Sequence, residues 1–210
     1  MQQIIRPLLI VIGIIMLLSI ITGWVAALTI PPITNHQEQM SDNSFNLQTG
    51  SAPIGDTNVE KLVKVLNKAY SDEWFAYHQY WIGSKIVRGP NKEAVIAELT
   101  LHATEELGHA VMLDTRIIQL GGTPVLEPRD WYRLTYCGYN APTDPYVTKV
   151  LEQNIKSEQC SIDMYNKLLV ETRDTDPVTY TLLLGILQME IEHKEDLQAL
   201  LDDIIVMTNP

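Results

Sequence analysis

One pattern of metal-ligating residue types occurs twice in this chain of 210 residues. Each copy has a lone glutamate and, 33 or 32 residues later, a Glu-x-x-His motif. Residues three apart on a helix share a face, so both side chains of each motif can point to one place. Carboxylates and imidazoles suit Fe(II) and Mn(II), and a glutamate can bridge two ions. The six residues are Glu73, Glu106, His109, Glu158, Glu190 and His193.

The duplicated spacing predicts how these residues divide between two metal ions. A helical bundle with one Glu from each of two helices and a Glu-x-x-His from each of the other two is the recipe for a di-iron or di-manganese site. We expect Glu106 and Glu190 to bridge the ions. The pairs expected to complete one ion each are Glu73 with His109 and Glu158 with His193. The competing interpretation is a set of ordinary helix glutamates and core histidines.

Four long helices are predicted to position these residues. Apolar residues in steps of three and four predict helices over about 57–88 and 91–121. Two later helices are predicted to open at Thr143-Asp144-Pro145 and Thr175-Asp176-Pro177, because an Asp N-cap followed by Pro is a strong start signal. All six candidate ligands fall on the buried seams. Four buried carboxyls repel one another unless they are protonated or paired with cations or metal.

The connections predict the topology. The first and second helices, and the third and fourth, are joined by short segments, so each pair should form an antiparallel hairpin. About 22 residues rich in proline and aromatic side chains separate the two hairpins. A long crossover between hairpins predicts an all-α fold, the ferritin-like form of the four-helix bundle.

Further polar residues lie near the predicted site. His102 precedes Glu106 by one helical turn and is interpreted as a third nitrogen ligand, a partner of a ligand, or a core histidine. Tyr80 and Tyr165, two turns past the lone glutamates, could hydrogen-bond ligands, supply an electron, or simply fill the core. Three glutamates off the seams are expected on a solvated face, with an iron access path as the alternative: Glu105, Glu192 and Glu195.

Cys137 and Cys160 are the only cysteines, and they lack metal-site spacing. Cys160 lies two residues past Glu158, about 200° around the helix, and should face away from that ligand. A disulfide, a redox pair that serves the site, and two independent buried thiols all remain open. A disulfide is allowed if the compartment is oxidising.

The N-terminal residues 1–30 are predicted to be a transmembrane anchor or a signal segment. Residues 7–30 are almost wholly apolar, and 24 residues span about 36 Å as a helix, enough for a bilayer core. An anchor would leave the following domain outside the cytoplasm. The alternative is secretion after cleavage near Ala27. Residues 31–56 are polar, with Pro and Gly, and are predicted to be a linker.

The formal net charge is −11. That balance argues against nucleic-acid binding, which calls for a basic patch. It favours a protein that attracts cations, although acidity for solubility alone explains it equally well.

Residues 57–206 resemble the ferritin-like superfamily and are closest to bacterioferritin-type sites. The six residues match that family's ligands one for one, and Tyr80 matches its site tyrosine. The stretch from Trp131 to Cys160 resembles the Dps-like branch called thioferritins, which pair this centre with two nearby cysteines and form twelve-subunit cages. The resemblance implies a ferroxidase with two iron ions per subunit (manganese is possible), oxygen or peroxide as oxidant, and roles in iron storage and oxidative-stress protection.

Departures from the family limit what carries over. No haem-ligating methionine can be assigned, so no haem is predicted, and no fifth helix is predicted after the fourth. We expect a homo-oligomer, dodecameric if the N-terminal segment is removed and smaller if the segment stays in a membrane. The second function considered is a tethered rubrerythrin-like di-iron peroxidase or oxidase without mineral storage. A tethered oxidase of lipid-soluble substrates and a metal-free structural bundle rank below it.

Overall fold

The structure is a computed structural model that describes residues 58–208. The predicted N-terminal hydrophobic segment (1–30) and linker (31–56) lie outside these residues. Among the residues described, none of the helices is both long and apolar enough to cross a membrane.

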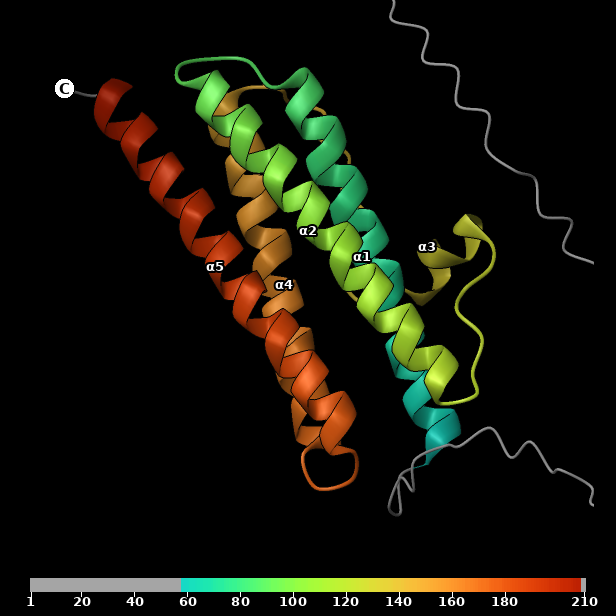
Figure 1. Ribbon diagram of the computed structural model, residues 1–210. Helices are drawn as coiled ribbons and strands as arrows, with labels where there is room; N and C mark the ends of the chain where they lie inside the picture. The colour runs from blue at the N-terminus through green and yellow to red at the C-terminus, as the bar shows by residue number, and fades with distance from the viewer. Residues whose placement is uncertain (1–57, 209–210) are drawn as a thin grey trace, which may run out of the picture. The chain divides into compact units, whose positions relative to one another are not determined.

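Four long helices carry the described domain (Figure 1). They are α1 (Val59–Ile86), α2 (Lys92–Gln119), α4 (Val147–Thr172) and α5 (Pro177–Thr208). A short 3-10 turn, η1 (Pro128–Asp130), and the single-turn helix α3 (Trp131–Leu134) lie in the long connection between α2 and α4. Helix α1 packs along α2, and α4 packs along α5, so the two hairpins form as predicted. The predicted all-α bundle with a long crossover is confirmed.

The two Thr-Asp-Pro sequences behave differently. Before α5 the prediction holds, because Asp176 accepts hydrogen bonds from the backbone N–H and the hydroxyl of Thr179, and Pro177 is the first helical residue. Before α4 it is wrong, because the helix begins two residues later, at Val147. There, Pro145 and Val147 exchange backbone hydrogen bonds with Arg88 at the end of α1, which holds this stretch extended.

The turn between α1 and α2 lacks the side-chain N-cap that Asn91 could provide. Asn91 immediately precedes α2, but its side chain makes no capping hydrogen bond, and its backbone is left-handed with φ of 54°. Glycine is needed at Gly89, where φ is 129° and a Cβ would lie 2.9 Å from Val147. The tight packing of this turn against the start of α4 therefore outweighs the capping preference of Asn91.

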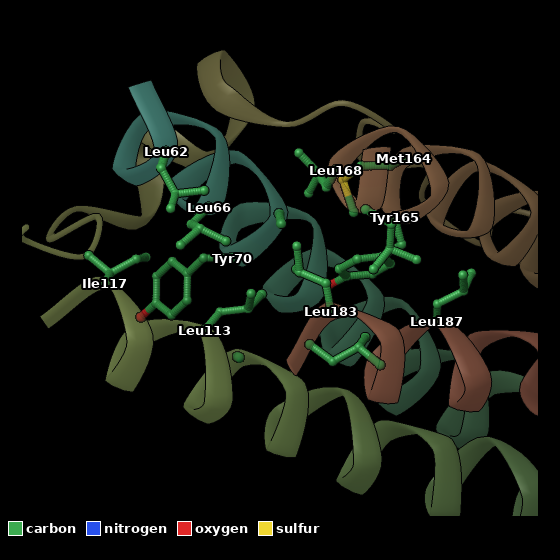
Figure 2. Packing of buried hydrophobic residues seen from close by; sticks show 14 of the residues in the cluster. Leu62, Leu66, Tyr70, Leu113, Ile117, Met164, Tyr165, Leu168, Leu183 and Leu187 are labelled. Carbon is green, nitrogen blue, oxygen red and sulfur yellow. The ribbon is translucent and has the colours of Figure 1, made fainter. Parts of the chain in front are cut away.

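The core consists of two apolar clusters. Figure 2 shows the first, which includes Leu66, Leu113, Leu168 and Leu183, one from each long helix. The second cluster again draws on all four helices, as in Leu99, Leu151, Leu197, Val87 and Tyr80. On every helix the candidate ligands lie in sequence between residues of the first cluster and residues of the second. The bundle thus encloses a polar layer between two apolar ones.

The crossover is attached to both hairpins. Asp72 of α1 accepts hydrogen bonds from the backbone N–H groups of Tyr136 and Cys137, at 2.9 and 3.0 Å, and from the hydroxyl of Thr135. Cys137 forms a disulfide with Cys160 of α4. Of the alternatives considered for the cysteines, two independent thiols are therefore wrong. Burial, despite these hydrogen bonds, raises the pKa of Asp72 to about 6.

Candidate metal centre

The six predicted ligands are brought together in the polar layer. Glu73 comes from α1, Glu158 from α4, and the two Glu-x-x-His motifs from α2 and α5. Each of these side chains is at most 3% exposed. Packing of the two hairpins against each other is what joins residues that are far apart in sequence.

Potential ligand atoms fall into two overlapping groups, within each of which they lie no more than 4.8 Å apart. The first group consists of Glu73, Glu106, His109 and Glu190, and the second of Glu106, Glu158, Glu190 and His193. The two glutamates common to both groups are those that the sequence assigns as bridges. The arrangement has the donor set of a two-metal site. Metal binding by these residues remains a prediction.

Both histidines point their Nδ1 atoms into the centre. Nδ1 of His109 lies 3.1 Å from Glu106, 3.2 Å from Glu190 and 3.4 Å from Glu73. Nδ1 of His193 lies 3.2 Å from Glu106 and 3.8 Å from Glu190. In both motifs the same ring nitrogen faces the shared glutamates, so both are positioned to donate a lone pair there once deprotonated.

Each buried tyrosine bonds a glutamate of the opposite hairpin. The hydroxyl of Tyr80 on α1 donates to Glu158 on α4, and that of Tyr165 on α4 donates to Glu73 on α1. Of the roles considered for these tyrosines, the structure shows this hydrogen bonding to candidate ligands. The reciprocal bonds fix the orientation of both lone glutamates and tie the two hairpins together.

The electrostatics of the centre are those of a crowded, buried set of acids. Burial and neighbouring carboxylates raise the pKa of Glu190 to about 8 and the pKa values of Glu106 and Glu158 well above their usual range. Burial opposes ionisation of Glu73 too, but its hydrogen bond with His109 keeps its pKa below the usual value. Despite burial, the close approach of Glu106, Glu190 and Glu73 raises the pKa of His109 well above normal. Without metal, Glu73 and His109 form an ion pair, and the carboxyls of Glu106, Glu158 and Glu190 are protonated. The four carboxyls and His109 together then carry no net charge.

Several buried polar atoms at the centre make no well-directed hydrogen bond, even where another polar atom lies 3.2 Å away. They are Oε1 of Glu106, Oε2 of Glu158, both carboxyl oxygens of Glu190, and Nδ1 of His193. Leaving such atoms unpaired costs about 1–3 kcal/mol each, so a folded protein normally satisfies them. All five belong to candidate ligands. Two cations bound among them would satisfy these atoms, which supports the fit between this residue set and a pair of metal ions.

The outer nitrogens of the two histidines have different partners. Nε2 of His109 lies 3.3 Å from the thioether of Met189. Nε2 of His193 lies 3.0 Å from the carboxylate of Glu105. Glu105, expected on a solvated face, is 32% exposed and also contacts His193, because contact between α2 and α5 brings it over that ring. Glu192 and Glu195 are exposed, as expected.

His102 lies outside the six-residue centre but next to it. Its ring stacks on that of His193 with centroids 4.1 Å apart, and its Nε2 is 3.0 Å from Glu98. Burial and neighbouring His193 lower its pKa to about 3, so the imidazole is neutral. Sequence reasoning left the role of His102 open and missed Glu98 and Asp196. Their positions one helical turn from His102 and from His193 were the available signal.

Comparisons with known proteins agree with this fold. Residues 63–207 match the ferritin family, described as a ferritin-like domain. The chain is 32% identical over 145 residues to the DNA protection during starvation protein of Pyrococcus furiosus, a match that covers 69% of this chain and 78% of that protein. It is 28% identical over 134 residues to the bacterioferritin of Desulfovibrio desulfuricans, covering 63% and 70% of the two chains.

A solved structure gives the same result. The dodecameric thioferritin of Bacteroides fragilis, a bacterioferritin-related protein, superposes with a TM-score of 0.71 at 41% identity and covers 72% of this chain and 90% of that one. The helical bundle and these matches together establish the relationship. The chain belongs to the ferritin-like domain family, among the homologues of Dps proteins and bacterioferritins.

Proposed function

We propose that the protein is a ferroxidase that binds two Fe(II) ions as substrate and oxidises them for iron storage and detoxification. The observation that carries this proposal is the pair of buried four-residue groups that share Glu106 and Glu190. Oxygens of both shared glutamates lack hydrogen-bond partners. Carboxylate bridging would place the two ions close enough to deliver two electrons to one oxidant molecule.

Two Fe(II) ions supply the two electrons that either oxidant takes up. Two Fe(II) give up two electrons and become two Fe(III), while hydrogen peroxide takes two electrons and two protons to form two water molecules. With O2 as oxidant, the same electrons and protons give hydrogen peroxide. The carboxyls of Glu106, Glu158 and Glu190 release protons as Fe(II) binds, because metal ligands must be deprotonated. Tyr80 and Tyr165 hold Glu158 and Glu73 in place through this change.

The relatives support iron handling and assembly. The similar proteins include a bacterioferritin and a dodecameric thioferritin. We infer that this chain also forms a homo-oligomer able to retain Fe(III). Another relative is named for protecting DNA. With a net charge of −11, we infer that any such protection here comes from removing Fe(II) and peroxide rather than from binding nucleic acid.

Iron retention tests this function. The full-length chain, purified in detergent because residues 7–30 are apolar, would receive repeated additions of Fe(II) with peroxide or oxygen. Iron per chain would then be counted after desalting. We expect uptake to continue well beyond two ions per chain. Uptake that stops at two would contradict storage and favour the rubrerythrin-like alternative, in which the centre turns over on electrons from a partner.

A further inference from the structure

The outer nitrogen of His109 is held against a thioether. Nε2 of His109 lies 3.3 Å from the sulfur of Met189, on the neighbouring helix α5. Nδ1 of the same ring faces the glutamates of the centre, so Nε2 carries the N–H when Nδ1 binds a metal ion. A thioether sulfur is only a weak hydrogen-bond acceptor. Of the two histidines of the centre, His109 therefore has the weaker acceptor at its outer nitrogen.

Met189 occupies the position that a carboxylate occupies in the other hairpin. Met189 and Glu105 each directly precede a shared glutamate, Glu190 and Glu106 respectively. Glu105 lies 3.0 Å from Nε2 of His193, so each of the two side chains contacts the outer nitrogen of a histidine on the facing helix. A change that gave Met189 an oxygen acceptor would make the two sides of the centre alike.

A methionine can gain such an oxygen by a single, reversible oxidation. Peroxide converts the thioether to a sulfoxide, which is polar, and enzymatic reduction restores the thioether. In Met189 the new oxygen would replace the sulfur as acceptor of the N–H of His109. Met189 is partly exposed, which gives a molecule as small as hydrogen peroxide access to the sulfur.

The neighbouring N–H should make Met189 react faster than its exposure alone indicates. The sulfur attacks one oxygen of hydrogen peroxide, and the O–O bond breaks as the S–O bond forms. The sulfur loses two electrons and the peroxide gains them. The other oxygen leaves as hydroxide, takes up the proton of the attacked oxygen and becomes water. A hydrogen-bond donor already in place stabilises the negative charge on the leaving oxygen.

We propose that Met189 is a modification site, at which hydrogen peroxide oxidises the thioether to a sulfoxide and so gives His109 a strong acceptor for its outer N–H. A strong acceptor there makes a ligating histidine more basic, so the metal ion is held more tightly. Exposure to peroxide thereby strengthens ion binding on the His109 side of the centre. The oxidation step stands on the contact between His109 and Met189, whereas its consequence for iron rests on the proposed ferroxidase function.

Peptide mass spectrometry of the full-length chain loaded with Zn(II) tests the oxidation step. Zn(II) binds imidazole and carboxylate ligands and has no redox chemistry, so the result does not depend on iron oxidation. Met207, which is 53% exposed in the last turn of the same helix, is the internal control. With dilute hydrogen peroxide we expect one added oxygen atom on Met189 before Met207. Oxidation of Met207 first, the order that exposure alone predicts, would overturn the proposal.

The metal-free chain repeats this test without reliance on metal binding. There His109 pairs with Glu73 through Nδ1, and its Nε2 still faces the sulfur of Met189. We expect Met189 again to be oxidised before Met207. The opposite order in the metal-free chain would also count against a reaction assisted by His109.

Substitutions separate the effect of the added oxygen from the loss of sulfur. Met189→Gln places an amide oxygen where the sulfoxide oxygen would lie, and Met189→Leu keeps the size of the side chain without an acceptor. Calorimetric titration should show one of the two bound Co(II) ions held about tenfold more tightly in Met189→Gln than in Met189→Leu. Met207→Leu, the matched control, should bind like the unaltered chain. Equal affinities in the two Met189 variants, both folded by their melting curves, would overturn the proposed effect on the metal.

Peroxide treatment before the same titration joins the two steps. The treated unaltered chain should move to the affinity of Met189→Gln, while Met189→Leu should not respond. The modification site and the ferroxidase function can fail separately. If Met189 is oxidised first and the Co(II) affinities differ, but Fe(II) is not oxidised, this site stands and the ferroxidase function is wrong. If Fe(II) is oxidised but Met207 reacts before Met189, the reverse holds.

Discussion

The two hairpins, α1–α2 and α4–α5, are alike at the centre and different just outside it. Each provides a lone glutamate, a Glu-x-x-His and a tyrosine that bonds the other hairpin's glutamate. Beyond the centre, His193 faces Glu105 and lies beside His102, whereas His109 faces Met189. The shared features are those that two-metal chemistry requires. The differences give the two histidines different chemical surroundings, a carboxylate for His193 and a thioether for His109.

The largest expected effect tests the likeness of the two halves. Glu106→Gln and Glu190→Gln should each lower Fe(II) oxidation by about 100-fold or more, because losing a bridging ligand should cost at least as much as losing a residue that only hydrogen-bonds a ligand, which costs about 10–100-fold. Both glutamates belong to both ligand groups, so the two variants should be equally inactive. Stopped-flow absorbance after peroxide addition would measure this. A variant that keeps most of its activity would show that its glutamate does not bridge.

The next largest expected effect is the pH dependence of the stability of the metal-free protein. Glu190 has a pKa of about 8 in the folded protein and about 4.5 when unfolded, so only the folded chain holds this proton between those values. Stability of the metal-free protein should therefore fall as pH rises from about 5.5 to 8, by up to about 1.4 kcal/mol per unit for this group.

Urea unfolding at several pH values would measure that slope. Glu190→Gln should flatten it, because glutamine stays neutral throughout. Bound divalent metal should remove it as well, since the cation favours the ionised carboxylate. A metal-free protein that becomes more stable over this range would contradict the protonated state inferred for the α4–α5 side of the centre.

The crossover is joined to α4 by the disulfide and to α1 by Asp72, and only the disulfide can be cut chemically. Reduction, or Cys137→Ser/Cys160→Ser, should lower the free energy of unfolding by about 3 kcal/mol, the value for closing a loop of this length. Chemical denaturation with and without reductant measures the change. Metal binding should persist. Loss of both bound ions on reduction would instead assign the cysteines a role at the centre itself.

The smallest effect concerns the outer partners of the two histidines. Glu105→Met would give His193 the same neighbour as His109, and Met189→Glu would do the reverse. A carboxylate that accepts a hydrogen bond from the outer N–H of a ligating histidine makes that imidazole more basic. Glu105→Met should therefore lower the affinity for one of the bound Co(II) ions about tenfold. Calorimetric titration would detect it. If affinity is unchanged in Glu105→Met, the carboxylate does not influence the ligand.

The sequence was sufficient to predict the centre because its signal is local and repeated. The Glu-x-x-His spacing places two side chains on one helix face regardless of the partner helix, and the apolar seams on either side fix which face is buried. The hairpin topology followed from connection lengths. The start of α5 was predictable for the same reason, since Asp176 caps residues within its own turn.

Features that depend on packing between distant segments escaped prediction. Asp144 has the same neighbours in sequence as Asp176, yet backbone bonds to Arg88 hold its segment extended. Glu105 and Asp196 lie off the seams of their own helices, and only the contact between α2 and α5 shows what they face. The reciprocal bonds of Tyr80 and Tyr165 likewise require both hairpins to be in place.

The most direct test of the two-metal oxidation centre is the stoichiometry of a single turnover. Fe(II) would be added without oxygen to the full-length chain, and peroxide would then be mixed in while Fe(III) absorbance is followed. We predict a fast phase whose amplitude saturates at two Fe(II) per chain and which is absent from the Glu106→Gln/Glu190→Gln variant. A fast phase of equal size in that variant, or none in the unaltered chain, would contradict it.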